Sequence, residues 1–304
     1  MKTATISPTE VFILYGNSSK NLKLSIRNTL SENNETVLTK YWEKYSFTDF
    51  AINRYGQLYL CRKMKNPKEN HIVYLDIIED YLNGKEGGFS KLVGLGKNCL
   101  NISIANDDRI WMVDNSGQVW SKGKLSENFA KVNTPELMSS VVIDMGGRIW
   151  GLSREKSNNG NHKIWTLKSY QDYMENSESQ ENWNFIQGNF VQLAVGGPYK
   201  QIWAINHLGN VYHSDCHSIQ KNEKFMNSDS INKLRGWHIL DKIKENKKIS
   251  IGNSGEIYKI DKDYNLQVKN GLYSSKWELI NPENAFVKLK QIATAKNGYL
   301  YGID

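Results

Sequence analysis

The chain has 304 residues, 39% of them hydrophobic, and a net charge of +7 at pH 7. This length and apolar content allow a large buried core, which excludes intrinsic disorder, and the apolar runs are too short to span a membrane as a helix. The basic stretches 62–65 and 242–248 are short and interrupted, so we expect solvated faces and no nucleic-acid partner.

The three cysteines, Cys61, Cys99 and Cys216, are few, odd in number and widely spaced. This pattern predicts no disulfide framework and favours a reducing compartment. Residues 1–6 lack the apolar core of a signal peptide, so we expect a cytoplasmic protein or one released without a leader. A mature secreted form remains an alternative.

Two strand-like segments open the chain, over residues 9–15 and 21–26. An aliphatic–aromatic pair, placed after a short strand and a turn, then recurs along the chain. The pairs are Leu58-Tyr59, Ile110-Trp111, Ile149-Trp150, Ile202-Trp203, Ile257-Tyr258 and Leu300-Tyr301. A period of about 48 residues is that of a β-propeller blade, which holds four strands. Asn-Ser-Gly turns at 115–117 and 253–255 indicate hairpins between these strands.

The repeat predicts an all-β fold: one β-propeller over residues 1–304, with six blades of four antiparallel strands. The approximate blades are 42–81, 89–125, 131–170, 183–215, 237–270 and 277–304, the last completed by 9–26. The sixth unit stops at Asp304 without an outer strand, so we expect an N-terminal strand to complete it and close the ring. Five blades would follow if the first unit is decoration, and seven would need a further unit.

A tryptophan opens four of the units, at Trp42, Trp183, Trp237 and Trp277. We expect these rings to seal the contact between neighbouring blades. The fourth unit carries the fullest pattern, with Trp183, Phe185-Ile186, Leu193-Ala194-Val195-Gly196, Ile202-Trp203, Asn206, Gly209 and Tyr212. This unit resembles a tectonin repeat. The second, fifth and sixth units resemble it less closely, and the second and third lack the opening tryptophan.

The tectonin-repeat family includes lectins of invertebrate defence, fish-egg lectins, bacterial and fungal sugar-binding proteins, and intracellular interaction modules. The resemblance therefore implies a propeller and, less directly, a lectin whose partners are glycans or glycoconjugates. Because two units lack the opening tryptophan, one equivalent sugar site per blade is not expected.

Two groups of residues are candidates for ligand binding. The hairpin tryptophans Trp111, Trp150 and Trp203 have faces that can stack on sugar rings, but their mid-strand positions favour a role in the core between blades. Turn residues are the better candidates, because turns on a rigid scaffold commonly carry function. They are Asn106, Asp107, Tyr199, Asn206, His207 and Asn253. Backbone geometry alone also selects asparagine and aspartate in turns.

The stretch His213-Ser214-Asp215-Cys216-His217 has metal-ligating residue types. With no second cluster nearby in sequence, it favours an exposed loop between the fourth and fifth blades over a zinc site. Catalytic motifs are missing, so we expect no enzyme, no cofactor and no metal. The sequence thus favours a lectin using blade-end loops. A protein-interaction scaffold using the polar insertion 153–162 is the main alternative, and an enzyme with a site in the central channel is a third reading.

Overall fold

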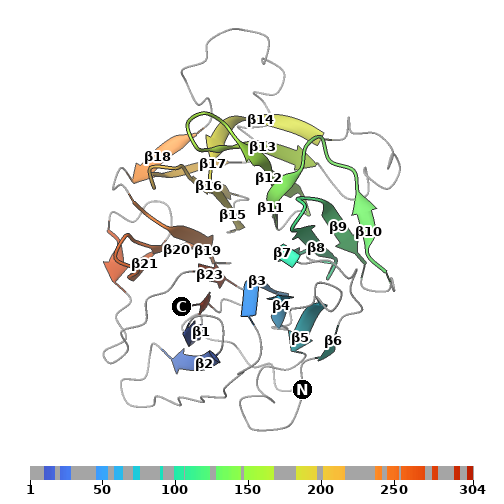
Figure 1. The fold of residues 1–304 in the computed structure, drawn as a ribbon. Coiled ribbons are helices and arrows are strands. Elements are labelled where there is room, and N and C mark those ends of the chain that lie inside the picture. Colours follow the sequence, from blue (N-terminus) through green and yellow to red (C-terminus); the bar gives the residue numbers. More distant parts are fainter. Residues whose placement is uncertain are drawn as a thin grey trace.

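The computed structural model shows a ring of strands (Figure 1). The structure describes residues 10–17, 21–28, 46–53, 58–63, 71–75, 90–91, 99–105, 107–123, 128–144, 147–167, 183–196, 201–215, 237–241, 245–252, 255–270, 276–279, 291–294 and 300–303. Every regular element in these ranges is a strand, and the strands form six four-stranded sheets. The predicted all-β propeller with four-stranded sheets is therefore confirmed.

The first sheet holds β3 (Ser46–Ile52), β4 (Leu58–Lys63), β5 (His71–Leu75) and β6 (Ser90–Lys91). The second holds β7 (Cys99–Ile104), β8 (Ile110–Asp114), β9 (Val119–Lys122) and β10 (Ala130–Val132). The third holds β11 (Met138–Ile143), β12 (Ile149–Lys156), β13 (His162–Leu167) and β14 (Trp183–Phe190). The fourth holds β15 (Gln192–Gly196), β16 (Gln201–Ile205), β17 (Val211–Asp215) and β18 (His238–Asp241). The fifth holds β19 (Lys248–Ile251), β20 (Glu256–Ile260), β21 (Leu266–Asn270) and β22 (Glu278–Leu279).

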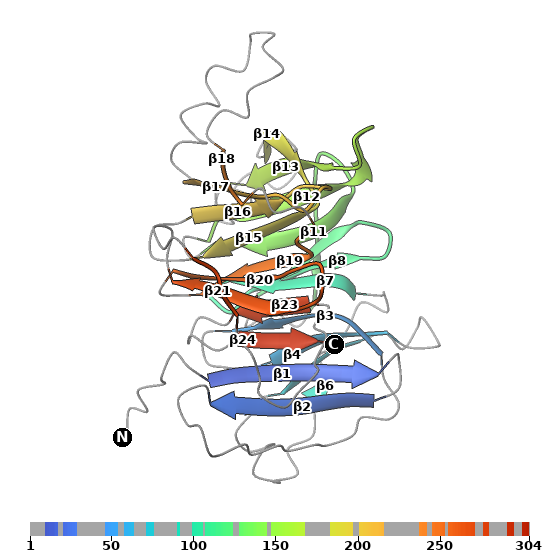
Figure 2. The same cartoon turned by 90° about the vertical axis from the view of Figure 1, so that its left-hand side faces the viewer.

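The closing sheet joins the two ends of the chain. Its order is β2 (Asn21–Asn28), β1 (Glu10–Asn17), β24 (Leu300–Ile303) and β23 (Gln291–Thr294). The N-terminal strands thus complete the C-terminal sheet, as the sequence predicts. One detail differs from the expected antiparallel blade: β1 runs parallel to β24, with Val11 opposite Leu300 (Figure 2). Parallel pairing is possible because β1 enters the sheet from outside the hairpin order.

The hydrophobic core lies between neighbouring sheets. Trp111, Trp150 and Trp203 are each at most 1% exposed. Trp111 packs with residues of both the second and the third sheet, including Val132, Val141 and Trp183. The three hairpin tryptophans are therefore core residues, which agrees with their mid-strand positions in the sequence.

A second seam runs along the outer strands. Trp183 begins β14, and its ring N–H donates to the carbonyl of Asn133, just after β10 of the preceding sheet (2.9 Å). Trp237, just before β18, donates in the same way to the carbonyl of Gln187 on β14 (3.0 Å). These two tryptophans seal adjacent sheets as expected. In the structure they stand at or just before the start of the outermost strand of a sheet, whereas the sequence repeat places them at the start of the next unit.

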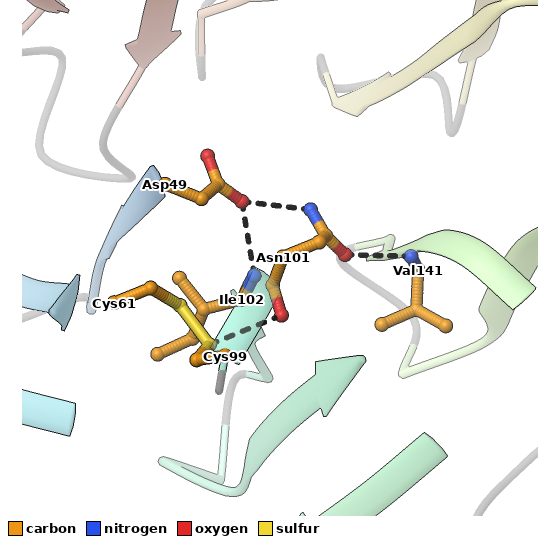
Figure 3. Close-up of a disulfide and its surroundings, with 6 residues drawn as sticks. All are labelled: Asp49, Cys61, Cys99, Asn101, Ile102 and Val141. Atoms are coloured by element: carbon orange, nitrogen blue, oxygen red, sulfur yellow. Dashed lines mark hydrogen bonds between the residues drawn. A yellow bond between two sulfur atoms is a disulfide. The ribbon is translucent and has the colours of Figure 1, made fainter. Parts of the chain in front are cut away.

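Polar side chains join the innermost strands. Asp49 on β3 accepts the backbone N–H of Ile102 on β7 (2.9 Å) and the side-chain amide of Asn101 (2.8 Å). Asn101 accepts the N–H of Val141 on β11 (2.7 Å), so the chain of bonds crosses three sheets (Figure 3). Gln192 on β15 bonds both the N–H and the C=O of Ile249 on β19. Side chains thereby supply hydrogen-bond partners to backbone groups of the innermost strands, which face the ring centre.

A disulfide links the first two sheets beside this network. Cys61 on β4 and Cys99 on β7 are bonded, 38 residues apart in sequence (Figure 3). The cysteine pattern did not predict this bond. The ring brings the second strand of one sheet against the first strand of the next, and the distance between two cysteines in the sequence does not reveal that contact.

Seven hairpin turns among the described residues share one backbone geometry. Each turn spans five residues. The backbone N–H of the first residue donates to the C=O of the fifth, the N–H of the fourth donates to the C=O of the first, and the fourth residue has a positive φ. The fourth residues are Asp108, Gly117, Gly147, Gly160, Gly209, Gly255 and Tyr264. This is a three-residue hairpin loop with a bulge, in which the positive φ favours glycine.

The first prediction concerns Gly209. An added Cβ there would lie 2.3 Å from the backbone nitrogen of Glu245, whereas one at Gly147 would meet nothing within 4 Å. Because both glycines have nearly the same positive φ (79° and 81°), Gly147→Ala should lose about 1 kcal/mol from conformation alone. Gly209→Ala should lose about 2 kcal/mol more from the clash. Urea denaturation of both variants measures the difference, and equal losses would contradict the docking of this turn.

The second prediction concerns the buried carboxyl of Asp49. Burial is the largest influence and raises its pKa from 3.8 to about 6, while hydrogen bonds and Lys248 act in the opposite direction. The folded protein should therefore take up a proton as the pH falls through about 6, and the unfolded chain only near 3.8. Stability should rise by roughly 2–3 kcal/mol on acidification across that window and be lost again as the pH rises.

Asp49→Asn keeps an acceptor for the Ile102 N–H and removes the titration. Its unfolding free energy should be flatter than that of the wild type between about pH 4 and pH 6. An unchanged pH profile in this variant would assign the dependence to other groups.

The third prediction concerns the disulfide. Reduction should destabilise the fold by about 2–4 kcal/mol, because the cross-link restricts the unfolded chain. The Cys61→Ser/Cys99→Ser protein should have the melting temperature of the reduced wild type, and reductant should not change it. Cys216→Ser, which alters the remaining cysteine, is the matched control and should keep the response of the wild type. A wild-type melting temperature that is indifferent to reductant would refute the bond.

Candidate functional site

The predicted turn residues lie at two different ends of the sheets. Asp107 falls between the first and second strands of its sheet, β7 and β8, whereas Asn206 and His207 fall between the second and third strands, β16 and β17. Successive antiparallel connections alternate between the two ends of a sheet. The structure therefore does not bring Asp107 together with His207. Asn106, Tyr199 and Asn253 lie outside the described residues.

Two of the predicted residues have local structural roles. Asp107 is exposed, and its carboxylate accepts the backbone N–H of Arg109 (3.1 Å) and lies 3.6 Å from the Arg109 guanidinium. Asn206 accepts the backbone N–H groups of Leu208 (3.1 Å) and Asn210 (2.9 Å). Such bonds are turn chemistry. The buried rings of Trp111, Trp150 and Trp203 present no open face to a ligand.

His207 differs, because a neighbouring sheet holds it in place. It is exposed, and Asn161 approaches it from the turn between β12 and β13. The Asn161 side-chain oxygen accepts the backbone N–H of His207 (2.8 Å), and the Asn161 amide nitrogen lies 3.0 Å from His207 Nδ1. Because the oxygen is already an acceptor, the amide nitrogen must donate to Nδ1. The neutral His207 ring then carries its proton on Nε2.

The turn that bears His207 is also held from its other side. The backbone N–H of Glu245 donates to Leu208 C=O (2.8 Å), and the Asn246 side chain donates to Gly209 C=O (2.8 Å). Asn246 is buried and lies in the segment that leads into β19 of the fifth sheet. The turn is thus fixed between its two neighbouring sheets, which makes its exposed side chains a rigid presenting surface.

The exposed groups around His207 define a candidate site, the Asn-His patch: Asn158, Asn159, His207 and Leu208. Both asparagines and His207 are exposed, and Leu208 is 46% exposed. The two turns nearly touch, since a Cβ added to Gly160 would lie 3.7 Å from that of His207. The patch combines amide groups, a ring and an apolar side chain on fixed backbone, a composition suited to a polar ligand with an apolar face.

The polar segment 153–162 is not the irregular insertion that the sequence suggested. It forms the far end of β12, the turn 157–161 and the start of β13. Asn161, which is only 4% exposed, is not among the residues predicted from the sequence. Its position right after Gly160, as fifth residue of the common turn, is the one sequence signal that could have singled it out.

The possible metal cluster belongs to a strand rather than to a loop. His213, Ser214 and Asp215 end β17, and the His213 ring stacks on that of His238 from β18, with centroids 5.3 Å apart. Cys216 and His217 lie outside the described residues. Within the ranges that the structure describes, no group of three or more His, Cys, Asp or Glu residues is placed to hold a metal. Nor does that part of the chain contain a helix long and apolar enough to cross a membrane.

Comparisons with solved structures identify the architecture. The fold is similar to YCF48 bound to D1 peptide (TM-score 0.50, 11% identity, 96% of this chain and 88% of that chain). It is also similar to human WBSCR16 (TM-score 0.55, 7% identity, 94% and 84%) and to streptogramin B lyase (TM-score 0.54, 11% identity, 99% and 92%). At these identities the likeness concerns the fold alone, and that fold is a β-propeller.

Sequence comparison gives a more specific relationship. Tectonin-1 of Physarum polycephalum is 29% identical over 85 residues, which are 28% of this chain. The matched part spans 30% of the length of that curated relative. The pattern of the Tectonin domain matches residues 64–303, from the first sheet to the last strand. Because this match covers most of the sequence, the chain belongs to the Tectonin domain family.

Proposed function

We propose that this protein is a non-catalytic glycan-binding propeller and that the Asn-His patch is one of its sites. The carrying observation is the fixed orientation of His207 by Asn161, which pre-organises an exposed ring and its Nε2 proton at the junction of two sheets. Pre-organisation supports binding because little conformational entropy is lost when the ligand arrives.

The chemistry of the patch matches that of a saccharide. Sugars present hydroxyl groups that pair with amides and ring nitrogens, and CH faces that pack on flat or apolar side chains. Asn158 and Asn159 supply the amides, and His207 with Leu208 supplies the packing surface. A shallow site of this kind binds weakly, so useful affinity needs several sites on one ligand or one surface.

A protein-interaction scaffold is the second candidate. The structural relative YCF48 is bound to a peptide, and exposed apolar side chains such as Leu137 (50%) and Leu208 (46%) lie beside turns of this chain. Such side chains serve protein interfaces as well as sugar faces. The positive net charge also suits an acidic partner.

The fourth prediction tests the proposed function. The full-length protein on a glycan array should bind at least one glycan class, and His207→Ala should reduce that binding roughly tenfold by removing the ring and its Nε2 donor. Asn161→Ala should weaken binding less, because it removes the orientation of the ring and leaves the ring present. His238→Ala, which removes an exposed histidine on β18, is the matched control.

Two results would decide against the proposal. Absence of binding to every glycan, with a protein partner recovered instead, would favour the scaffold. If His207→Ala binds glycan as well as His238→Ala does, the glycan site is not the Asn-His patch.

A further inference from the structure

In several sheets a side chain on the third strand has a polar group that forms a hydrogen bond with a side chain of the preceding turn. In the second sheet the ring N–H of Trp120 donates to Asp114 (2.9 Å), and in the fifth sheet Gln267 donates to Asp261 (3.0 Å). In the fourth sheet the hydroxyl of Tyr212 accepts from Asn206 (3.4 Å). In each case the partner is the first residue of the hairpin turn, three residues after the hairpin aromatic.

The third sheet breaks this pattern. Ser153 occupies the position three residues after Trp150, but the turn begins four residues later, at Ser157. The Ser153 hydroxyl donates to Glu155 C=O (2.9 Å) and accepts the Lys163 N–H (2.9 Å). The equivalent third-strand residue is Trp165, opposite Gly151. Its ring N–H is buried and has no hydrogen-bond partner among the described residues.

A buried acceptor near β13, a carboxylate oxygen of Glu136, also has no hydrogen-bond partner in the described structure. Glu136 lies in the connection from β10 to β11. Its Oε1 accepts from the Lys163 amine (2.5 Å), whereas its Oε2 is buried without a partner in the described structure. Lys163 and Trp165 alternate along β13 and so share one face of the strand. That face packs toward the second sheet, since Trp165 contacts the cluster formed with Trp111 and Val132.

An exposed ring completes the arrangement. Phe185 on β14 lies opposite Trp165, with ring centroids 5.5 Å apart and planes at 68°. It is 38% exposed, a high value for a phenylalanine in a sheet. We call Glu136, Lys163, Trp165 and Phe185 the flank site. Orphaned buried polar atoms cost free energy of folding. The unpaired donor of Trp165 lies beside the exposed Phe185 ring, and the unpaired acceptor of Glu136 belongs to the side chain that contacts Lys163 on the same strand face. These atoms are candidates for groups that a ligand satisfies.

We propose that the flank site binds a neutral saccharide, with Phe185 against a CH face of the sugar ring and Glu136 Oε2 accepting a sugar hydroxyl. Lys163 donates to a neighbouring hydroxyl, and the Trp165 ring N–H donates to a sugar oxygen. The charges of Glu136 and Lys163 cancel, which favours a neutral polyol over an acidic or basic ligand. This inference rests on the proposed glycan-binding function and adds a site on the opposite face of the third sheet from Asn161 and His207.

The contact between Lys163 and Glu136 can open to admit a ligand hydroxyl. The Lys163 side chain is 48% exposed, so its contact with Glu136 is an exposed ion pair that breaks at little cost. The pairing also raises the pKa of the Lys163 amine, with the Glu136 hydrogen bond as the main cause. The amine is therefore charged at neutral pH while it is paired with Glu136.

The fifth prediction uses fluorine NMR of the full-length protein labelled with 5-fluorotryptophan. Trp165→Phe assigns the Trp165 resonance, and the other tryptophan resonances report whether each variant is folded. Methyl glycosides of glucose, galactose, mannose and N-acetylglucosamine are the probes. At least one should shift the Trp165 resonance saturably and leave the buried Trp203 resonance in place.

Variants then test the roles of the side chains. Glu136→Gln and Phe185→Ala should each weaken the titration of Trp165 roughly tenfold, through loss of a charged acceptor and of the stacking ring. Phe185→Tyr should retain most of the affinity because it keeps the ring. Glu278→Gln, which changes an exposed glutamate on β22, is the control and should titrate like the wild type.

The outcomes separate this inference from the proposed function. If no pyranoside moves the Trp165 resonance, the flank site is refuted, even where array binding depends on His207. If the Trp165 resonance moves and array binding ignores His207→Ala, the flank site stands and the Asn-His patch fails. Titration of Trp165 that Glu136→Gln and Phe185→Ala leave unchanged would also overturn the assignment.

Discussion

The structure depends on the covering of each sheet by its neighbours. The sheets have four short strands each, and their aromatic residues are buried only where two sheets meet, as Trp111 is between the second and third sheets. Small sheets of this kind gain little stability alone, because both faces need a partner. Closing the ring with β1 beside β24 supplies that partner for the last sheet. The polar bonds from Asp49 through Asn101 to Val141 then align the inner strands that the hydrophobic seams bring together.

The fold was predictable because its causes repeat along the sequence. An aliphatic–aromatic pair next to a turn indicates a hairpin, and the recurrence of that pair indicates a propeller. The prediction holds even when one unit matches the pattern poorly. Tyr264 shows how much imperfection is tolerated: it takes the positive-φ position that glycine usually fills, and the turn keeps its geometry. The parallel pairing of β1 was not predictable, since residue patterns indicate a strand and not its direction.

The candidate site was only half predictable. His207 follows from turn composition, but its orientation depends on Asn161, which is 46 residues away in the sequence. The same limit applies to Cys61 and Cys99, whose pairing depends on which strands of adjacent sheets face each other. Residue patterns in a single sequence indicate local structure, that is, where a strand or a turn lies. Contacts between units depend on the shape of the ring, and a short repeat pattern does not encode it.

Both candidate sites arise from one irregularity, the longer hairpin of the third sheet. Its turn begins seven residues after Trp150, whereas the corresponding turns begin three residues after Trp111 and Trp203. The extension carries Asn161 out to the turn of the fourth sheet, where it fixes His207. It also leaves Ser153 at the position where the second, fourth and fifth sheets have an aspartate or asparagine, so that the Trp165 ring N–H has no acceptor there. Regular repeats satisfy their own polar groups, and a departure from the repeat leaves groups available to a ligand. Both proposed sites therefore depend on the third sheet, where the repeat pattern breaks, and the Asn-His patch combines its longer turn with the regular turn of the fourth sheet.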